Sequence, residues 1–163
     1  MEYLKSYIGR KISGFIRLNH YQENYSYFQS LGIHFQFIGK NNGILIITDN
    51  IGNEIICSIL HKEQFEEEKL DGYGHIHYPK ADDHLNIIVN KELKGLRLGQ
   101  HSAAELQGNG FTIQRGKIQA IIFRFEDKEL LLMNSGDEIW TEVDEKIKVE
   151  KLKEEDIKWI EIK

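Results

Sequence analysis

The 163-residue chain contains one cysteine and one proline, and both scarcities restrict what the protein is. A single cysteine, Cys57, excludes an intramolecular disulfide and any zinc site built from several cysteines. Cys57 lies in the apolar run 55–60, where we expect it to pack as a small hydrophobic side chain. A single proline, Pro79, and the lack of a Ser/Gly-rich run argue against a flexible linker or a disordered region.

Long apolar runs and a leader pattern are missing as well. The first residues lack a basic segment followed by an apolar one, so no signal peptide is expected. No apolar stretch approaches the ~20 residues that span a bilayer. Hydrophobic residues make up 40% of the chain, which is enough for a core. We therefore expect a soluble cytoplasmic protein that has no membrane partner and forms one compact domain or two small, tightly apposed ones.

A basic surface stripe is the third missing feature. The formal net charge is −5, and the segment from Asp137 to Lys163 contributes −4 of it, from ten acids and six bases. A nucleic-acid-binding protein should show clustered Lys and Arg, so we expect no nucleic-acid partner. The acidic skew is compatible with a basic protein partner, although a solvated face is the commoner explanation of such a skew.

The same pattern occurs twice along the chain. Six positions recur at one constant offset: Leu4, Tyr7, Ile8, Ile12, Gly14 and His20 match Leu85, Ile88, Val89, Leu93, Gly95 and His101. Three more recur at a slightly larger offset: Gly52, Glu54 and Ile55 match Gly136, Glu138 and Ile139. A unit of about 80 residues used twice bounds the architecture more tightly than local propensity does.

Each copy is predicted to begin with a short amphipathic helix, because residues 4, 7 and 8, like 85, 88 and 89, share one helix face. Asp82 or Asp83 is a plausible N-cap of the second helix. A strand and three meandering strands follow, separated by turns rich in Asn and Gly. We therefore predict an α+β fold, mainly β, in which two helix-plus-antiparallel-meander units pack through a shared sheet or face to face.

The predicted domain boundaries follow from this repeat. We assign one compact domain, 1–163, with repeat A at 1–61, a connection at 62–81, repeat B at 82–145 and a C-terminal tail at 146–163. Residues 63–70 of the connection are expected to be helical, and residues 72–79 irregular or strand-like. The end of the tail is expected to form a last strand.

The histidine-rich connection offers one candidate metal site. If His75 and His77 lie on a strand, both imidazoles face the same side, as metal ligation requires. Asp82 and His84 follow within ten residues and supply further donor atoms. Repeat B lacks a matching pair, and a polar connecting loop explains the same residues. We predict no metal and no cofactor, and keep His75, His77, Asp82 and His84 as weak candidates for a metal-dependent enzyme.

His20 and His101 recur at equivalent positions after the first strand of each copy. A pseudo-symmetric pair could line a groove and act as acid, base or ligand. Their neighbours differ, so one ancestral loop histidine that survived twice, or an accidental match, explains them too. The sequence has no nucleophile with supporting neighbours and no phosphate-binding loop. We therefore predict that the protein is not an enzyme.

Three short motifs carry a resemblance to a known class of proteins. Residues 8–14 read Ile-Gly-Arg-Lys-Ile-Ser-Gly, Phe-x-Phe follows at 35–37, and Gly-Asn-Glu-Ile follows at 52–55. This pattern resembles small bacterial domains among the immunity proteins of polymorphic toxin systems, which are compact α+β proteins with meandering sheets. The matched positions are turn and core positions, so the resemblance carries over no functional residue. It implies a stoichiometric inhibitor that masks a toxin's active site through an acidic or aromatic surface.

The expected function is therefore a protein-binding module, an immunity protein that neutralises a basic toxin such as a nuclease. Aromatic anchors beside acidic side chains are the expected contacts: Tyr21, Tyr25, Tyr27, Asp137, Glu138, Glu142, Asp144 and Glu145. A small-ligand or regulatory domain that binds in a groove between the halves is the alternative. The oligomeric state stays open.

Overall fold

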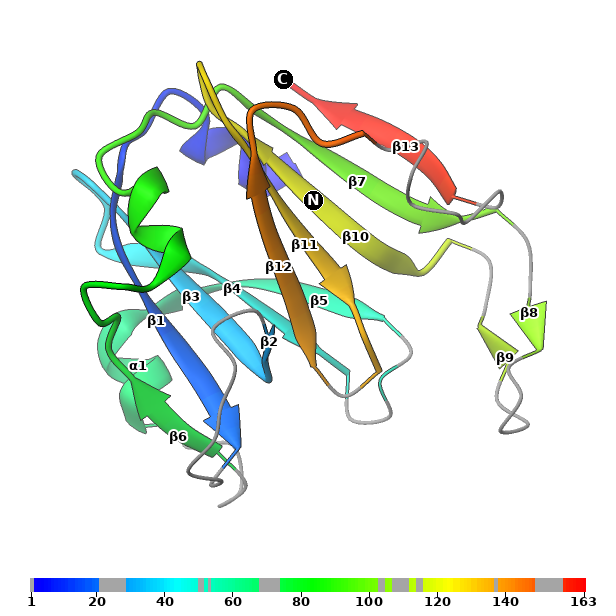
Figure 1. The fold of residues 1–163 in the computed structure, drawn as a ribbon, viewed down its shortest axis with the longest axis horizontal. Coiled ribbons are helices and arrows are strands. Elements are labelled where there is room, and N and C mark those ends of the chain that lie inside the picture. Colours follow the sequence, from blue (N-terminus) through cyan, green and yellow to red (C-terminus); the bar gives the residue numbers. More distant parts are fainter. Residues whose placement is uncertain are drawn as a thin grey trace.

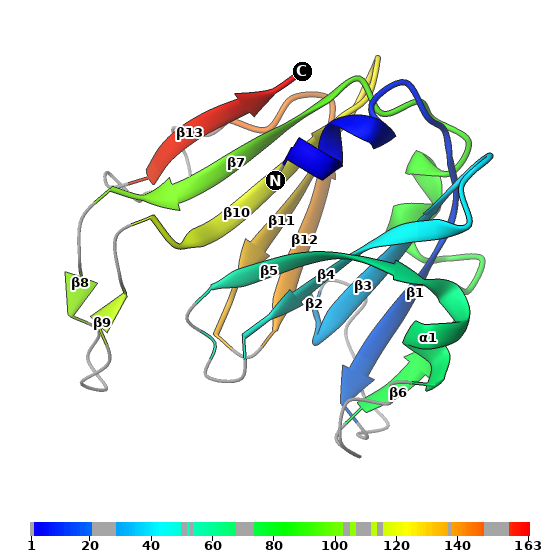
Figure 2. The ribbon, with the colours of Figure 1, turned by 180° about the vertical axis from the view of Figure 1, so that it is seen from behind.

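The computed structural model describes residues 2–20, 29–49, 52, 54–67, 74–102, 105–106, 112–113, 116–136, 138–148 and 157–163. Two antiparallel sheets face each other in this part of the chain (Figures 1 and 2). The first sheet has the order β5 (Ile55–His61), β4 (Asn42–Thr48), β3 (Gly32–Phe37), β1 (Ile12–His20), β6 (Gly74–His77). The second has the order β13 (Ile157–Ile162), β7 (Gly95–His101), β10 (Ile118–Arg124), β11 (Glu129–Asn134), β12 (Ile139–Asp144), β2 (Gln29–Ser30). Strands β8 (Glu105–Leu106) and β9 (Thr112–Ile113) form a separate pair.

The prediction of an α+β fold with a helix at the start of each unit is wrong, because the structure is nearly all β. The expected helices are short 3-10 turns, η1 (Glu2–Tyr7) and η2 (His84–Ile88), and the six-residue α1 (Lys62–Glu67) covers the first part of the expected 63–70 helix. Short helical segments of this kind often take the 3-10 form. A 3-10 turn also places residues three apart on one face, so it satisfies the same apolar spacing.

The inner faces of the two sheets share one core. Alternating side chains point inward from the central strands of both sheets, and Phe35 of β3 meets Phe123 of β10 with ring centroids 5.2 Å apart. Both rings are fully buried. The 3-10 turns add Leu4, Tyr7, Leu85 and Ile88 to this same core. Packing two sheets face to face buries the apolar side of each, which one meander could not do alone.

The strand order of the first sheet, β5-β4-β3-β1-β6, has a counterpart in the order β12-β11-β10-β7-β13 of the second. Four backbone hydrogen bonds join the two 3-10 regions reciprocally: Gly9 to Leu93 (2.8 Å), Asn90 to Ile12 (2.8 Å), Ile12 to Lys91 (3.0 Å) and Leu93 to Arg10 (2.9 Å), each named from donor N–H to acceptor carbonyl. The repeat offset that matches Ile12 with Leu93 relates these bonds in pairs. The Gly9–Leu93 bond corresponds to the Asn90–Ile12 bond, and the Ile12–Lys91 bond corresponds to the Leu93–Arg10 bond. The two halves are thus related locally by an approximate two-fold axis.

This equivalence includes strands outside the predicted repeat boundaries. Strand β6 lies in the segment assigned to the connection and pairs with β1, whereas β13 lies in the assigned tail and pairs with β7. Helix α1 covers the outer face of the first sheet, where Phe65 packs near Ile16 and Leu18. Within the described ranges, no helix is long and apolar enough to cross a membrane.

Candidate partner-binding groove

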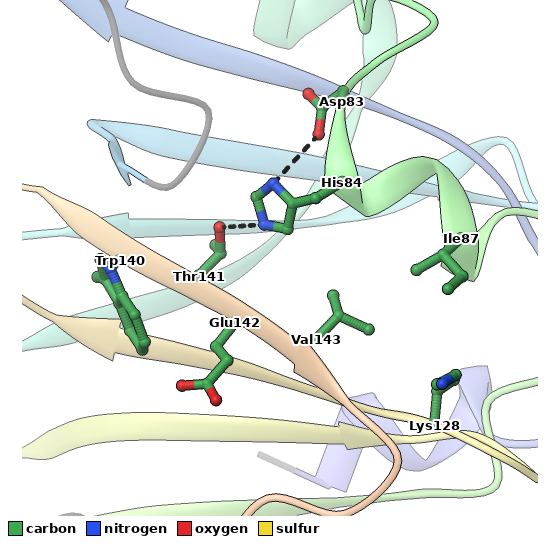
Figure 3. A pocket seen from close by; sticks show the side chains of 8 residues that line it. All are labelled: Asp83, His84, Ile87, Lys128, Trp140, Thr141, Glu142 and Val143. Atoms are coloured by element: carbon green, nitrogen blue, oxygen red, sulfur yellow. Dashed lines mark hydrogen bonds and ion pairs between the residues drawn. The ribbon is translucent and has the colours of Figure 1, made fainter.

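A groove runs between η2 and the outer edge of β12 (Figure 3). Its volume is about 470 Å³, and its lining residues are Asp83, His84, Ile87, Lys128, Trp140, Thr141, Glu142 and Val143. Four of these are consecutive residues of β12, so the groove follows the strand edge. Figure 3 shows the Val143 side chain pointing toward η2 and Glu142 pointing to the opposite side of the strand, as strand alternation requires.

A buried ion pair fixes the η2 wall of this groove. Asp83 is the N-cap of η2, and its Oδ1 accepts from the Leu85 N–H at 3.0 Å. Arg17 of β1 donates to the same carboxylate from Nε at 2.7 Å and from Nη2 at 2.9 Å. Its Nη1 donates to the Ser30 hydroxyl at 2.9 Å. The side chains of Arg17 and Asp83 are 1% and 0% exposed, so each charge depends on the other for compensation.

His84 joins η2 to β12. Its Nε2 lies 2.9 Å from the Thr141 hydroxyl, and its Nδ1 lies 3.8 Å from Asp83 Oδ1. Burial and the nearby Arg17 lower the pKa of His84, and Asp83 opposes this effect. The imidazole is therefore neutral at neutral pH. A carboxylate, an imidazole and a hydroxyl thus lie in a row. Thr141 is fully buried, however, and Arg17 already binds the Asp83 carboxylate. The contact between His84 and Thr141 therefore holds η2 against the sheet.

The β12 edge beside η2 presents backbone groups to the groove. Strand β2 pairs with β12 only at Ile139 and Trp140 within the described residues. The hairpin closes with the Ser135 N–H donating to the Glu138 carbonyl at 2.9 Å, and the register then continues without a shift to Asp144. Because hydrogen-bonded and non-hydrogen-bonded pairs alternate in antiparallel sheets, the Val143 peptide groups point away from β11, toward the groove.

The predicted contact residues fall into two sets. Glu142, Asp144 and Glu145 come together at the end of β12, where Asp144 and Glu145 are exposed and Glu142 lines the groove. Glu138 lies at the other end of the strand, about 20 Å away along six residues. The other predicted contacts, Tyr21, Tyr25, Tyr27 and Asp137, lie outside the described residues.

Two of the candidate metal ligands lie on β6 and one, His84, lies on η2. His75 and His77 lie on β6 with ring centroids 6.4 Å apart, and burial together with His75 and Lys80 lowers the pKa of His77. Asp82 is exposed, whereas His84 binds Thr141. Among the described residues, no group of three or more His, Cys, Asp and Glu side chains is arranged to hold a metal ion.

The remaining candidates occupy strand ends and the core margin. His20 and His101 end β1 and β7, in the equivalent positions that the sequence assigns them; His101 is buried, and the His20 side chain lies outside the described set. Cys57 of β5 packs against the core, and burial raises the pKa of its thiol to about 12. The thiol therefore stays protonated at neutral pH.

A second depression occupies the equivalent place in the first half. It has a volume of about 510 Å³ and lies between η1 and β5, with the lining Tyr3, Ser6, Tyr7, Lys40, Asn41, Asn42, Ile59 and His61. Here the Tyr3 hydroxyl donates to the Cys57 carbonyl at 2.7 Å. That contact occupies an outward-facing carbonyl of the β5 edge.

The sequence analysis missed the Arg17–Asp83 pair, although the repeat indicates that Arg17 lies at a core position. The offset that matches Gly14 with Gly95 aligns Arg17 with Leu98, a buried core residue. A charged residue at an inward-facing strand position requires a buried counter-charge. The sequence analysis names Asp82 or Asp83 as an N-cap, and the structure places the cap at Asp83.

Comparison of the chain with protein-family models, curated proteins and solved structures finds no match. The resemblance to immunity proteins therefore stays a prediction.

Proposed function

We propose that the protein is a protein-binding module that inhibits a basic partner, in the manner of an immunity protein that neutralises a toxin. The observation that supports this most directly is the cluster of Glu142, Asp144 and Glu145 at the end of β12, beside the groove. These carboxylates belong to the segment that carries −4 of the net charge of −5. A basic partner would be steered toward this end of the molecule.

The groove adds an apolar centre to this acidic rim. Ile87 is 48% exposed on η2 and faces the half-buried Val143 across the groove. Interfaces commonly combine a central apolar contact that excludes water with a charged periphery that sets the association rate. The two features lie on the same two elements, so one partner surface can engage both.

The decisive experiment pairs the protein with the product of the neighbouring gene. If that product is a basic toxin, co-expression should restore growth, and the purified proteins should form an equimolar complex whose association slows as salt rises. The proposal fails if co-expression restores no growth and no complex forms at low salt.

A charge-matched pair of variants tests the acidic cluster. Asp144→Asn with Glu145→Gln removes two charges from the cluster, and Glu63→Gln with Glu126→Gln removes two exposed charges elsewhere. We expect the first variant to slow association by about tenfold at low salt and the second by less than about twofold. Equal effects would show that only net charge matters and that the cluster is not the contact.

A further inference from the structure

We propose that the depression between η1 and β5 is a binding site for a small organic anion, a carboxylate or a phosphate ester. This depression, which we call the η1 pocket, has a volume of about 510 Å³, and small-molecule sites have volumes of about 300–1,000 Å³. None of the described residues that line it is Asp or Glu, although the chain carries a net charge of −5. The inference goes beyond the proposed function and does not rest on it. The lining residues are Tyr3, Ser6, Tyr7, Lys40, Asn41, Asn42, Ile59 and His61.

Lys40 supplies the positive charge of the η1 pocket. Its Nζ lies 5.3 Å from the centroid of the buried Tyr7 ring, which holds the ammonium against the pocket wall. Within the described chain, no carboxylate lies within ion-pair distance of this Nζ. Burial raises the pKa of the Tyr7 phenol, so the phenol stays neutral and adds no negative charge of its own. A half-buried cation without a protein counter-ion favours an anionic ligand.

N–H donors surround this cation. The Tyr3 hydroxyl donates to the Cys57 carbonyl at 2.7 Å, so this carbonyl points away from β4, toward η1. Peptide groups two residues apart on a strand share one direction, so the Ile59 N–H points to the η1 pocket as well. Further N–H groups come from side chains of the lining: Asn41, Asn42 and His61. A cation with several N–H donors beside it suits the oxygens of a carboxylate or a phosphate.

An apolar wall beside these donors favours an organic anion over an inorganic one. Ile59 is partly buried against the core and lines the η1 pocket. Tyr7 packs on Phe37 with ring centroids 4.8 Å apart, so its ring is held in place. A small aromatic or aliphatic group next to the charged group of the ligand can therefore cover Ile59 and the ring of Tyr7.

The equivalent corner of the second half has a different charge balance. Lys128 corresponds to Lys40, because each follows a buried phenylalanine by three residues and each lines the cavity at its corner. In the second half, however, the lining of the groove also contains Asp83 and Glu142. The η1 pocket has no carboxylate among its described lining residues, so only this corner favours an anion.

The hairpin next to each lysine differs in the same direction. In the second half, Asp127 accepts an ion pair from Lys91 at 2.7 Å. In the first half the corresponding residues are Gly39 and Arg10, and the Arg10 Nη1 lies 3.6 Å from the position that a Cβ on Gly39 would take. Within the described chain, Arg10 has no carboxylate partner. Arg10 therefore adds uncompensated positive charge beside the η1 pocket.

Matched lysine variants test the site. Lys40→Met keeps the apolar stem over Tyr7 and removes the charge, and Lys128→Met makes the same change at the equivalent corner. The probes are phenyl phosphate and benzoate, with the neutral benzyl alcohol as the control, titrated into the full chain and followed by NMR chemical shifts. We expect at least one anion to bind the wild type with a dissociation constant below about 1 mM and to shift the amides of Asn41, Asn42 and Ile59. Lys40→Met should weaken this binding at least about tenfold, and Lys128→Met less than about twofold.

A third variant covers the case in which Lys40→Met is unstable. His61 is exposed, so His61→Ala should leave the fold intact, and we expect it to weaken binding of the anion by about threefold. Binding of either anion that depends on Lys40, or on His61 where Lys40→Met does not fold, supports the proposal, and the tighter anion identifies the charged group of the ligand. Equal binding of benzyl alcohol, equal effects of the two lysine variants, unchanged binding in His61→Ala, or no shift of the pocket amides up to about 10 mM probe overturns it. These measurements use the protein alone, so they stand or fall independently of the partner.

Discussion

The η1–β5 corner and the η2–β12 corner have the same backbone arrangement and different chemistry. In the first, the Tyr3 hydroxyl binds the Cys57 carbonyl at 2.7 Å. In the second, His84 takes the place of Tyr3 and its ring binds the Thr141 hydroxyl at 2.9 Å. The phenol donates to an outward-facing backbone carbonyl of β5, whereas the imidazole binds a side chain of β12. The same backbone frame thus carries a different contact at each corner, because a tyrosine in one half is replaced by a histidine in the other.

A second difference lies at one inward position of the first strand in each half. Leu98 of β7 contributes apolar area to the core, whereas the equivalent Arg17 of β1 pairs with Asp83. This pair attaches η2, which belongs to the second half, to the first sheet. The two halves therefore differ at the place where they are joined. Four predictions test where the halves behave alike and where they differ.

The largest effect is expected from Asp83→Ala. The substitution leaves the buried Arg17 without its counter-charge and removes the N-cap of η2, and we expect a loss of about 3–5 kcal/mol in the free energy of unfolding. Arg17→Leu combined with Asp83→Asn restores the apolar residue seen at Leu98 and keeps a capping side chain. This double variant should recover most of the loss in urea denaturation. A double variant as unstable as Asp83→Ala would show that loss of the ion pair itself, and not the unpaired charge of Arg17, lowers the stability.

Equivalent core positions should respond alike. Phe35→Ala and Phe123→Ala should each lower the free energy of unfolding by about 3–5 kcal/mol, because each removes a fully buried ring from the same interface. The double variant should cost less than the sum, since the two rings contact each other. Denaturation of the three variants measures both effects. Single losses that differ by more than about 2 kcal/mol would mean that the two sheets do not share the core equally.

Gly9 and Asn90 test the backbone frame itself. Both have positive φ, +82° and +66°, and they occupy equivalent positions after the 3-10 turns. A Cβ at Gly9 would meet nothing within 4 Å, so the cost of Gly9→Ala is conformational, about 1–2 kcal/mol. Gly9→Asn, which copies the other half, should cost clearly less, because Asn tolerates this region of φ. Thermal unfolding of both variants checks the order, and an equal loss contradicts it.

The smallest effect concerns pH. The pKa of His84 is lowered in the folded state, so the unfolded chain takes up the proton first and stability falls as pH drops below about 6.5. His84→Gln should flatten this fall between about pH 7 and pH 5. The pKa of His77 is lowered too, so part of the slope should persist. Urea denaturation across this range measures the slope, and an unchanged slope in the variant removes His84 as its source.

Much of the strand pattern was predictable from the sequence, and the helical part was not. Alternating apolar residues mark β3 and β10, and the turns that bound the meanders carry residues suited to positive φ, such as Gly39 and Gly136. The α+β prediction failed because Leu4 and Tyr7 are three residues apart, a spacing that a 3-10 turn meets as well as an α-helix does. The last strand expected at the end of the tail is β13. Residues 72–79 were predicted as irregular or strand-like, because the short β6 carries little apolar signal.

The sequence by itself determined the recurrence of one pattern in the two halves, an N-cap at Asp82 or Asp83 and the acidic skew of the C-terminal segment. These are local or countable properties, and they are read directly from residue types and their spacing. Only the tertiary structure decided that Arg17 meets Asp83, 66 residues away, that His84 crosses to Thr141, and that Val143 faces a groove. Such contacts depend on which strand lies at a sheet edge and which face turns inward, and both are set when the two sheets pack on one core.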